Sequence, residues 1–165
     1  MPNVKKAGHL LAFKDNKRKI LLTQRNDIPM WVLPGGYKES KETIEAAVVR
    51  EVKEETGYEG EIKNLAAVYE SMDGGVKKYL YVGEIIGGSP KISSETRKVV
   101  WFDIGKLPPG LTLYEQQRIN DGLNFDGDVI HREYKIDYFK EALNQLKHPL
   151  FFLLLLFNAV KSKIS

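Results

Sequence analysis

The sequence predicts one α+β domain in which several strands surround a single amphipathic helix and further helices follow towards the C-terminus. Short segments rich in β-branched and aromatic residues recur up to residue 104. One uninterrupted helical segment stands among them, and helix-forming segments come after the last strand. At 165 residues with 42% hydrophobic and 28% charged residues, the chain is long enough to bury a core as one domain.

Composition excludes several functional classes. The chain has no cysteine, which rules out disulfides, a thiolate nucleophile and cysteine-based zinc sites. A net charge of +3 without a long basic block argues against a stable nucleic-acid partner. Eight of the 22 acidic residues fall between Glu39 and Glu61, so one segment is locally acidic. We expect a cytoplasmic protein.

Two strands are expected first, at 7–13 and 19–25, joined as a hairpin by a polar turn. The sequence Pro34-Gly35-Gly36 then indicates a chain break. Residues 43–56 contain no helix breaker, and they are preceded and followed by residues typical of helix ends, Thr43 as N-cap and Gly57 as stop.

Strand character returns at 61–70, 76–86 and 98–104. Residues 112–115 are a capping box that opens another helix, which Gly122 is expected to close.

The C-terminal part is predicted to be helical, with a helix over 138–147 and an apolar tail over 149–165 that follows the domain of residues 1–148. The uncharged stretch between Lys147 and Lys161 covers 13 residues, whereas a spanning helix needs roughly 20. We therefore expect a helix packed on the core or at a homodimer interface, with membrane-surface attachment as the alternative.

A helical wheel of residues 43–56 places carboxylates where apolar residues belong. Glu51 and Glu55 fall inside the stripe formed by Ile44, Ala47, Val48 and Val52, and Glu54 falls at its edge. Burying like charges together is costly without a cation, and Mg²⁺ takes oxygen ligands. The pattern favours a metal site, and the alternative is a partly exposed acidic helix end. The glycines before the helix allow the backbone to supply a ligand or to approach a phosphate.

The segment from Gly36 to Tyr58 resembles the box of the Nudix hydrolases, G-x5-E-x7-R-E-U-x-E-E-x-G-U, in which U is a bulky aliphatic residue. Eight positions match in register, and Tyr58 alone departs from the pattern. The matching residues are Gly36, Glu42, Arg50, Glu51, Val52, Glu54, Glu55 and Gly57. The resemblance covers residues 7 to about 120.

The resemblance implies an α/β/α sandwich with a mixed sheet and hydrolysis of a nucleoside diphosphate linked to a group X. Mg²⁺ is the expected cofactor, with Mn²⁺ as an alternative. It implies Glu51, Glu54 and Glu55 as metal ligands, with the Gly35 carbonyl as a further ligand. A catalytic base is expected among Glu51, Glu54 and Glu95.

Other positions are expected to support the site. Glu42 and Arg50 are expected to pair and to hold the loop against the helix. Arg25 is a candidate phosphate contact or a plain surface cation, and Gly36 is a candidate for close approach to a phosphate. A nucleobase needs an aromatic face, for which the candidates are Trp31, Tyr37, Tyr69, Tyr79 and Tyr81.

The motif is silent on X. The short stretch before the first strands leaves no room for the extra N-terminal subdomain of many ADP-ribose hydrolases, which favours a nucleoside triphosphate, either ribo or deoxy. The alternatives are ADP-ribose or a nucleotide sugar, and, in another class, a nucleotide-sensing module without turnover.

Overall fold

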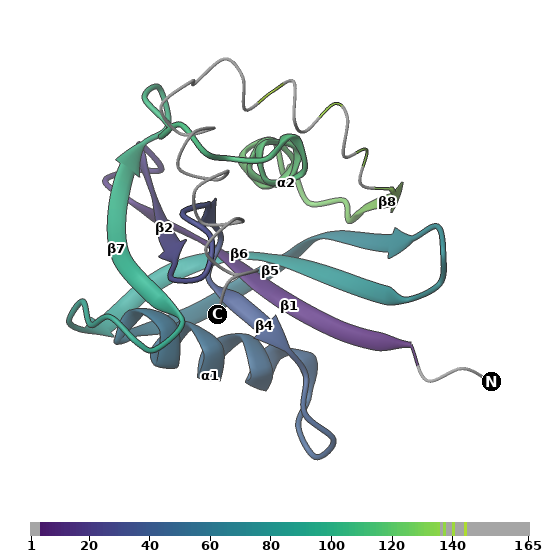
Figure 1. The fold of residues 1–165 in the computed structure, drawn as a ribbon, viewed down its shortest axis with the longest axis horizontal. Coiled ribbons are helices and arrows are strands. Elements are labelled where there is room, and N and C mark those ends of the chain that lie inside the picture. The colour runs from purple at the N-terminus through teal and green to yellow at the C-terminus, as the bar shows by residue number, and fades with distance from the viewer. Residues whose placement is uncertain (1–3, 136, 138–139, 141–143, 145–165) are drawn as a thin grey trace, which may run out of the picture.

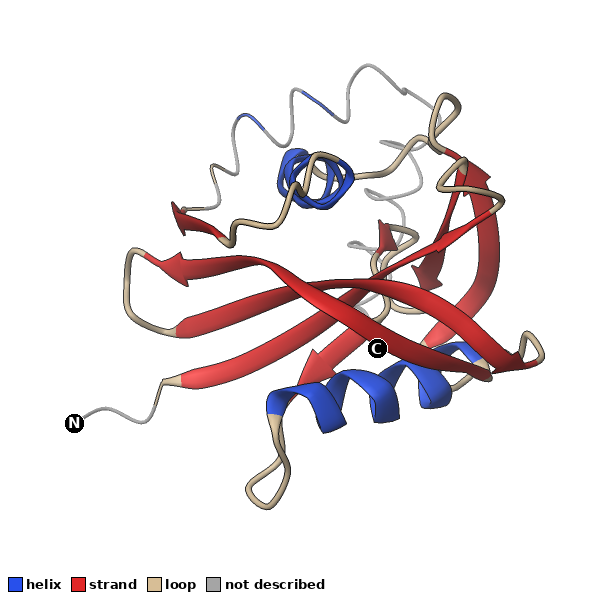
Figure 2. Cartoon of the chain, turned by 180° about the vertical axis from the view of Figure 1, so that it is seen from behind, coloured by secondary structure: helices blue, strands red, loops and turns tan. Residues whose placement is uncertain are grey.

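The computed structural model describes residues 4–135, 137, 140 and 144. Within that part of the chain, eight strands form one mixed sheet, and the helices α1 and α2 lie on its opposite faces (Figures 1 and 2). The elements in chain order are β1 (Lys5–Lys14), β2 (Lys19–Arg25), β3 (Trp31–Val32), β4 (Gly35–Tyr37), α1 (Ile44–Thr56), β5 (Tyr58–Ser71), β6 (Val76–Gly88), β7 (Thr96–Asp103), α2 (Leu113–Leu123) and β8 (Ile130–Tyr134). The prediction of an α/β/α sandwich with a mixed sheet is confirmed.

The strand β1 organises the sheet because it changes partners along its length. On one side it pairs in parallel with β6 over residues 5–13. On the other side its first half pairs with β4, and its end pairs with β2. The strands β2 and β4 therefore diverge from a common neighbour, which leaves a gap in the sheet between them.

The five predicted strands are all present, but three short strands were missed. The residues Pro34-Gly35-Gly36 do not simply break the chain, because Gly35 and Gly36 belong to β4 and pair with His9 and Gly8 of β1. The strand β3 consists of two residues that pair with β2, and β8 pairs in parallel with β5. The strands β4 and β8 depend on partners that are distant in sequence, and β3 has only two residues, so local pattern does not reveal them.

The helix α1 begins and ends as predicted. The Thr43 hydroxyl accepts a hydrogen bond from the Ala46 amide at 3.1 Å, and Gly57 takes the left-handed conformation with φ of 74°. Its buried face, which includes Ala47, Val48 and Val52, packs on β1 and β5.

The prediction for α2 was right at its start and wrong at its end. Thr112 caps the helix by accepting a hydrogen bond from the Glu115 amide. Gly122 does not close the helix, which continues to Leu123 and is capped by Asn124. Gly122 instead allows close packing, because a Cβ atom there would lie 2.4 Å from the Leu11 side chain.

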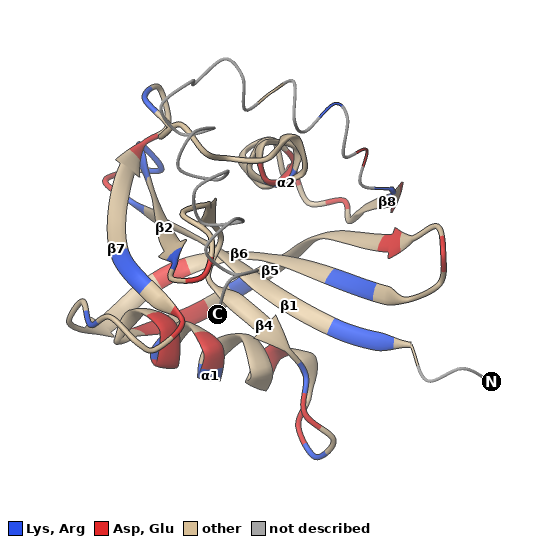
Figure 3. Ribbon diagram, viewed as in Figure 1, with Lys and Arg blue, Asp and Glu red and all other residues tan. Residues whose placement is uncertain are grey.

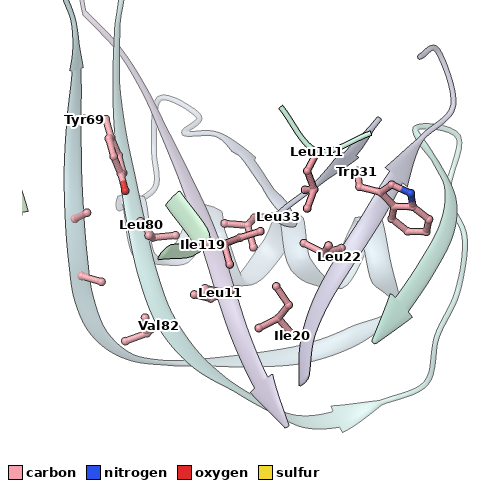
Figure 4. Close-up of a cluster of buried hydrophobic side chains, with 12 residues drawn as sticks. Leu11, Ile20, Leu22, Trp31, Leu33, Tyr69, Leu80, Val82, Leu111 and Ile119 are labelled. Carbon is pink, nitrogen blue, oxygen red and sulfur yellow. The ribbon is translucent and has the colours of Figure 1, made fainter. Parts of the chain in front are cut away.

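Two apolar cores hold the layers together. One lies between the sheet and α2 and includes Leu11, Leu22 and Ile119 (Figure 4). The other lies between the sheet and α1 and includes Leu10, Val48 and Val52. Each fully buried aliphatic side chain of this kind contributes about 1.5–3 kcal/mol. Leu10 and Leu11 are consecutive residues of β1 and point into different cores, because side chains along a strand alternate between its two faces.

The expected tail over 149–165 lies outside the described residues, as does most of the expected helix over 138–147. Among the helices that the structure describes, none is long and apolar enough to cross a membrane.

Candidate active site

A pocket of about 1070 Å³ lies beside the gap in the sheet and reaches both faces. It is lined by residues from the strands β1, β2, β3, β4 and β6, the helices α1 and α2, and the loops after β2, β3 and β6. Its acidic wall comes from α1 and from the loop before β7, whose acidic stretches lie near each other in Figure 3. The lining residues are Ala7, His9, Arg25, Asn26, Asp27, Val32, Leu33, Gly35, Gly36, Tyr37, Glu51, Glu54, Glu55, Lys78, Ser93, Ser94, Glu95 and Glu115.

The three glutamates of α1 all line this pocket, but they differ in exposure. Glu51 is held in place with 19% of its side chain exposed, whereas 61% of the Glu54 side chain is exposed. Glu55 is partly buried, and its carboxylate accepts a hydrogen bond from the Gly35 amide at 3.0 Å. The structure therefore places two inward carboxylates and one at the edge, in the arrangement that the helical wheel predicted.

Glu95 joins these glutamates from a distant part of the chain. Its loop is anchored by the Asn26 amide, which donates a hydrogen bond to the Glu95 carbonyl at 2.8 Å, and by the Asn26 side chain, which donates to Ser94. This anchor brings the exposed Glu95 carboxylate to the pocket that Glu51 and Glu55 line.

The acidic wall carries more negative charge than its surroundings neutralise. Burial raises the pKa of Glu55 to about 7, and the charges of Glu51 and Glu95 add to this effect. Burial also raises the pKa of Glu51, although the hydrogen bond from Arg50 opposes the shift. A cation placed between these carboxylates would relieve both perturbations.

Arg50 is a hub that fixes the loop before α1 against the helix. Its guanidinium donates two hydrogen bonds to Glu42, at 2.8 and 3.2 Å, in a bidentate pair. It also donates to the carboxylates of Glu51 at 3.0 Å and Glu54 at 3.2 Å, and to the Tyr37 carbonyl. The hydrogen bond from Arg50 and a second one from the Glu39 amide lower the pKa of Glu42 to about 2.

The two glycines of β4 touch the glutamates in different ways. Gly35 has φ of 143° and donates its amide hydrogen to Glu55. Gly36 leaves room for Glu51, because a Cβ atom at this position would lie 2.5 Å from the carboxyl carbon of Glu51. Glycine is therefore needed here for close approach of a side chain.

Two further expected residues lie at the pocket. Arg25 forms a bidentate pair with Asp27, at 2.9 and 2.6 Å, with about half of each side chain exposed. Among the described tyrosine, tryptophan and phenylalanine residues, Tyr37 alone lines the pocket, and 55% of it is exposed. Trp31, Tyr69 and Tyr81 are buried in the two cores.

The sequence analysis missed the far end of the pocket, which faces α2. His9 and Lys78 line it from neighbouring strands, and Glu115 lines it from α2. Arg118, with 1% of its side chain exposed, donates a hydrogen bond to Glu115 at 2.6 Å. A signal was available, since Glu115 and Arg118 stand three residues apart on the same side of α2 as the buried Ile119.

The acidic wall suits a hard divalent cation in its chemistry. It offers only oxygen ligands, from carboxylates whose charge is poorly compensated. Among the described residues, however, no three acidic or histidine side chains already converge as a metal-binding group. Arg50 contacts one oxygen of Glu51 and one of Glu54, which leaves the second oxygen of each carboxylate for a cation.

The fold and this wall define a class of protein, a hydrolase that acts on diphosphate bonds. The NUDIX domain family matches residues 4–120, and the chain belongs to this family. The chain is accordingly one of the Nudix pyrophosphohydrolases, whose members generally use a divalent metal such as Mg²⁺.

Relatives carry two kinds of name. A Bacillus subtilis protein named as a candidate 8-oxo-dGTP diphosphatase is 34% identical over 123 residues, covering 74% of this chain and 83% of the relative. An ADP-ribose pyrophosphatase of Methanocaldococcus jannaschii is 42% identical over 102 residues, which are 58% of this chain and 59% of the relative.

A solved structure agrees with the fold. The crystal structure of an ADP-ribose pyrophosphatase from Streptococcus suis matches with a TM-score of 0.67 and 29% identity, over 79% of this chain and 98% of the other.

Proposed function

We propose that the chain hydrolyses a diphosphate bond in a nucleoside diphosphate linked to a group X, in a reaction that depends on Mg²⁺. The observation that carries the proposal is the wall of four carboxylates, Glu51, Glu54, Glu55 and Glu95, along one side of a pocket large enough for a nucleotide. Carboxylates repel a polyphosphate, so a wall of this kind suits such a substrate only together with cations.

Glu51, Glu54 and Glu55 would hold the metal, with the Gly35 carbonyl as a further ligand. The bound ion supplies charge neutralisation on the phosphate oxygens and polarises the phosphorus under attack. Gly35 contributes in a second way, since its amide fixes the Glu55 carboxylate at 3.0 Å. Mn²⁺ has the same preference for oxygen ligands and is expected to substitute.

Water activation is assigned to Glu95, with Glu51 and Glu54 as the alternatives. A bond forms between the water oxygen and phosphorus, the bond from phosphorus to the leaving oxygen breaks, and one water proton passes to the carboxylate. Arg50 donates hydrogen bonds to both Glu51 and Glu54, so one oxygen of each carboxylate is already occupied by a donor. Glu95 has no such partner among the described residues, and its side chain is exposed to solvent.

Glu42 and Arg50 act as positioning residues in this proposal. Their bidentate pair and the bond from Arg50 to Glu51 set the orientation of the metal-binding carboxylates. Arg25, at the rim, is proposed to contact a phosphate while Asp27 holds its guanidinium in place.

For X we favour a phosphate, so that the substrate is a nucleoside triphosphate. The relative named for 8-oxo-dGTP supports this class, and the match covers most of both chains. ADP-ribose is the second candidate, because the names of the Methanocaldococcus jannaschii relative and of the Streptococcus suis structure specify it.

The decisive experiment compares carboxylate variants with a matched control on a substrate panel with Mg²⁺. Glu54→Gln, Glu55→Gln and Glu95→Gln should each abolish turnover of the best substrate while thermal melts show an intact fold. Glu59→Gln removes an exposed carboxylate on β5 that pairs with Lys53, and it should leave turnover unchanged. Parent rates in both Glu54→Gln and Glu55→Gln would exclude α1 as the metal site.

The panel should contain dNTPs, oxidised dNTPs, ADP-ribose, dinucleoside polyphosphates and nucleotide sugars, and products should be identified by mass. Binding of nucleotides without any product would instead indicate a sensing module. Faster hydrolysis of ADP-ribose than of every triphosphate would select the second candidate.

A further inference from the structure

The far end of the pocket contains a group of positive charges that the proposed chemistry leaves unused. This cationic end consists of the charged Lys78 on β6 and Arg118 on α2, the neutral imidazole of His9 on β1, and Glu115 as its one described carboxylate. Lys78, His9 and Glu115 line the pocket, and the buried Arg118 pairs with Glu115. His9 and Lys78 each lie two residues before a core residue on the same strand, Leu11 and Leu80 respectively. Residues two apart on a strand point to the same face of the sheet, so this end faces α2. It is thus separate from the wall formed by α1.

The positive charge at this end exceeds the negative charge. The Lys78 ammonium lies 4.6 Å from the centre of the Tyr114 ring and 5.0 Å from that of Tyr134, and it forms no ion pair with a described residue. Burial and then Arg118 lower the pKa of Lys78, which reflects a cation held near a like charge with little solvent. Glu115 is already shared with Arg118, so one positive charge remains uncompensated.

Unused hydrogen-bond donors point to the same conclusion. Only 1% of the Arg118 side chain is exposed, yet its Nε and Nη2 atoms have no hydrogen-bond partner among the described residues. His9 Nδ1 is likewise buried without a described partner. Burial lowers the pKa of His9 well below its usual value, so the ring is neutral and free to donate one hydrogen bond. Buried polar groups in native proteins are nearly always satisfied, which suggests a ligand here.

We infer that this cationic end binds an anionic part of X and that Lys78 is a residue that determines substrate specificity. This inference rests on the proposed function for the identity of X. A phosphate or carboxylate of X would then lie at Lys78, and the diphosphate at the glutamates. Tyr37 pairs with Ala7 of β1, which also pairs with Lys78, so its ring lies on the same face of the sheet as the cationic end. The enzyme should prefer an X that carries a negative charge over a neutral sugar.

The first test measures binding of inorganic pyrophosphate to the full chain by calorimetry in EDTA. Without metal the glutamate wall repels anions, and any contact with Arg25 is the same in the parent and in a Lys78 variant, so the difference in binding reports the cationic end. Lys78→Met retains the side-chain volume and an apolar contact with the tyrosine rings, and it should weaken binding at least tenfold. Equal binding by parent and Lys78→Met would overturn the inference.

The control variant is Lys77→Met. Lys77 lies on the same strand with its side chain on the opposite face and pairs with Glu70 at 2.5 Å. It undergoes the same change of charge outside the pocket, so pyrophosphate binding should stay at the parent level. A loss as large as in Lys78→Met would mean that overall charge governs binding, and it would also overturn the inference.

The second test compares UDP-glucuronate with UDP-glucose, which differ in X by one carboxylate. The parent should show a higher kcat/KM for UDP-glucuronate, and Lys78→Met should lose about tenfold of that preference. If Lys78→Met slows both substrates equally, this end binds the nucleoside instead and the inference fails.

The pyrophosphate test needs neither metal nor turnover, which separates the two proposals. A chain that binds pyrophosphate through Lys78 but hydrolyses nothing on the panel contradicts the proposed function alone. A chain that hydrolyses nucleotides while Lys78→Met binds pyrophosphate like the parent contradicts only this inference.

Discussion

Gly36→Ala tests whether the position of the Glu51 carboxylate controls catalysis. Gly36 lies in β4 outside the left-handed region, so its backbone accepts alanine without strain. The new Cβ atom would lie 2.5 Å from the carboxyl carbon of Glu51 and 2.6 Å from its Oε1. The substitution therefore displaces Glu51 without altering its chemistry.

The size of the effect follows from these distances. Carbon atoms in contact stay about 3.5 Å apart, so the carboxylate must move by about 1 Å. A misplacement of that size at a reacting centre costs about 100-fold in rate, which corresponds to about 2.7 kcal/mol of barrier. The movement also disturbs the 3.0 Å bond from Arg50 to Glu51, so the carboxylate does not simply rotate to an equivalent place.

The assay is kcat/KM with Mg²⁺ for the best substrate, together with thermal melts. Gly105→Ala serves as the matched control, since its new Cβ atom would contact only the exposed Asp103 side chain at 3.2 Å. Gly36→Ala should lose about 100-fold with the fold retained, while Gly105→Ala stays at the parent value. Parent kcat/KM in Gly36→Ala would refute the reasoning that Glu51 must occupy this position.

Three further predictions concern metal, acid and packing. Mg²⁺ at 100 times its Kd should stabilise the metal-free parent by about 2.7 kcal/mol, and an equal gain in Glu55→Gln would show that Glu55 is not a ligand. The hydrogen bond from Arg50 lowers the pKa of Glu42 from 4.5 to about 2, so the stabilisation is complete above pH 4.5 and lost as pH falls towards 2. Urea unfolding should therefore show Glu42→Gln less stable than the parent at pH 7, with the difference vanishing near pH 2, and a constant difference would contradict the pairing. Gly122→Ala should destabilise by about 1–3 kcal/mol in urea because of overpacking on Leu11, whereas helix propensity alone predicts stabilisation.

The sequence predicted those elements whose signals are local. The helix α1 has its cap, its apolar stripe and its glycine stop within 15 residues, from Thr43 to Gly57, and each was found in the structure. The short strand β4 has no such signal, because it exists through pairing with β1. Gly122 misled for a different reason, since a glycine that ends a helix and one that permits close packing look the same in sequence.

The same distinction applies to the candidate site. Glu51, Glu54 and Glu55 lie on one helix, so their spacing alone places them together. The cationic end draws on β1, β6 and α2, and only the pairing of β1 with β6 and the packing of α2 bring these residues together. Lys77 and Lys78 are adjacent on β6 and therefore point to opposite faces of the sheet. Which of the two enters the pocket follows from the register of β6 with its neighbours.

The two ends of the pocket make opposite demands on a substrate, and this difference explains why metal dependence and specificity should be separable. In the proposed arrangement an anionic X would meet the cationic end directly, so its binding there should need no metal. A diphosphate at the wall of α1 meets Glu51 and Glu55, and repulsion keeps it away until cations occupy the wall. Metal should therefore act mainly on the diphosphate and hence on turnover, whereas Lys78 should act on the choice of X. A variant at the α1 wall should change turnover and leave the preference for X nearly constant, and a variant at Lys78 should do the reverse. The two ends share no described ion pair, so their effects should be independent.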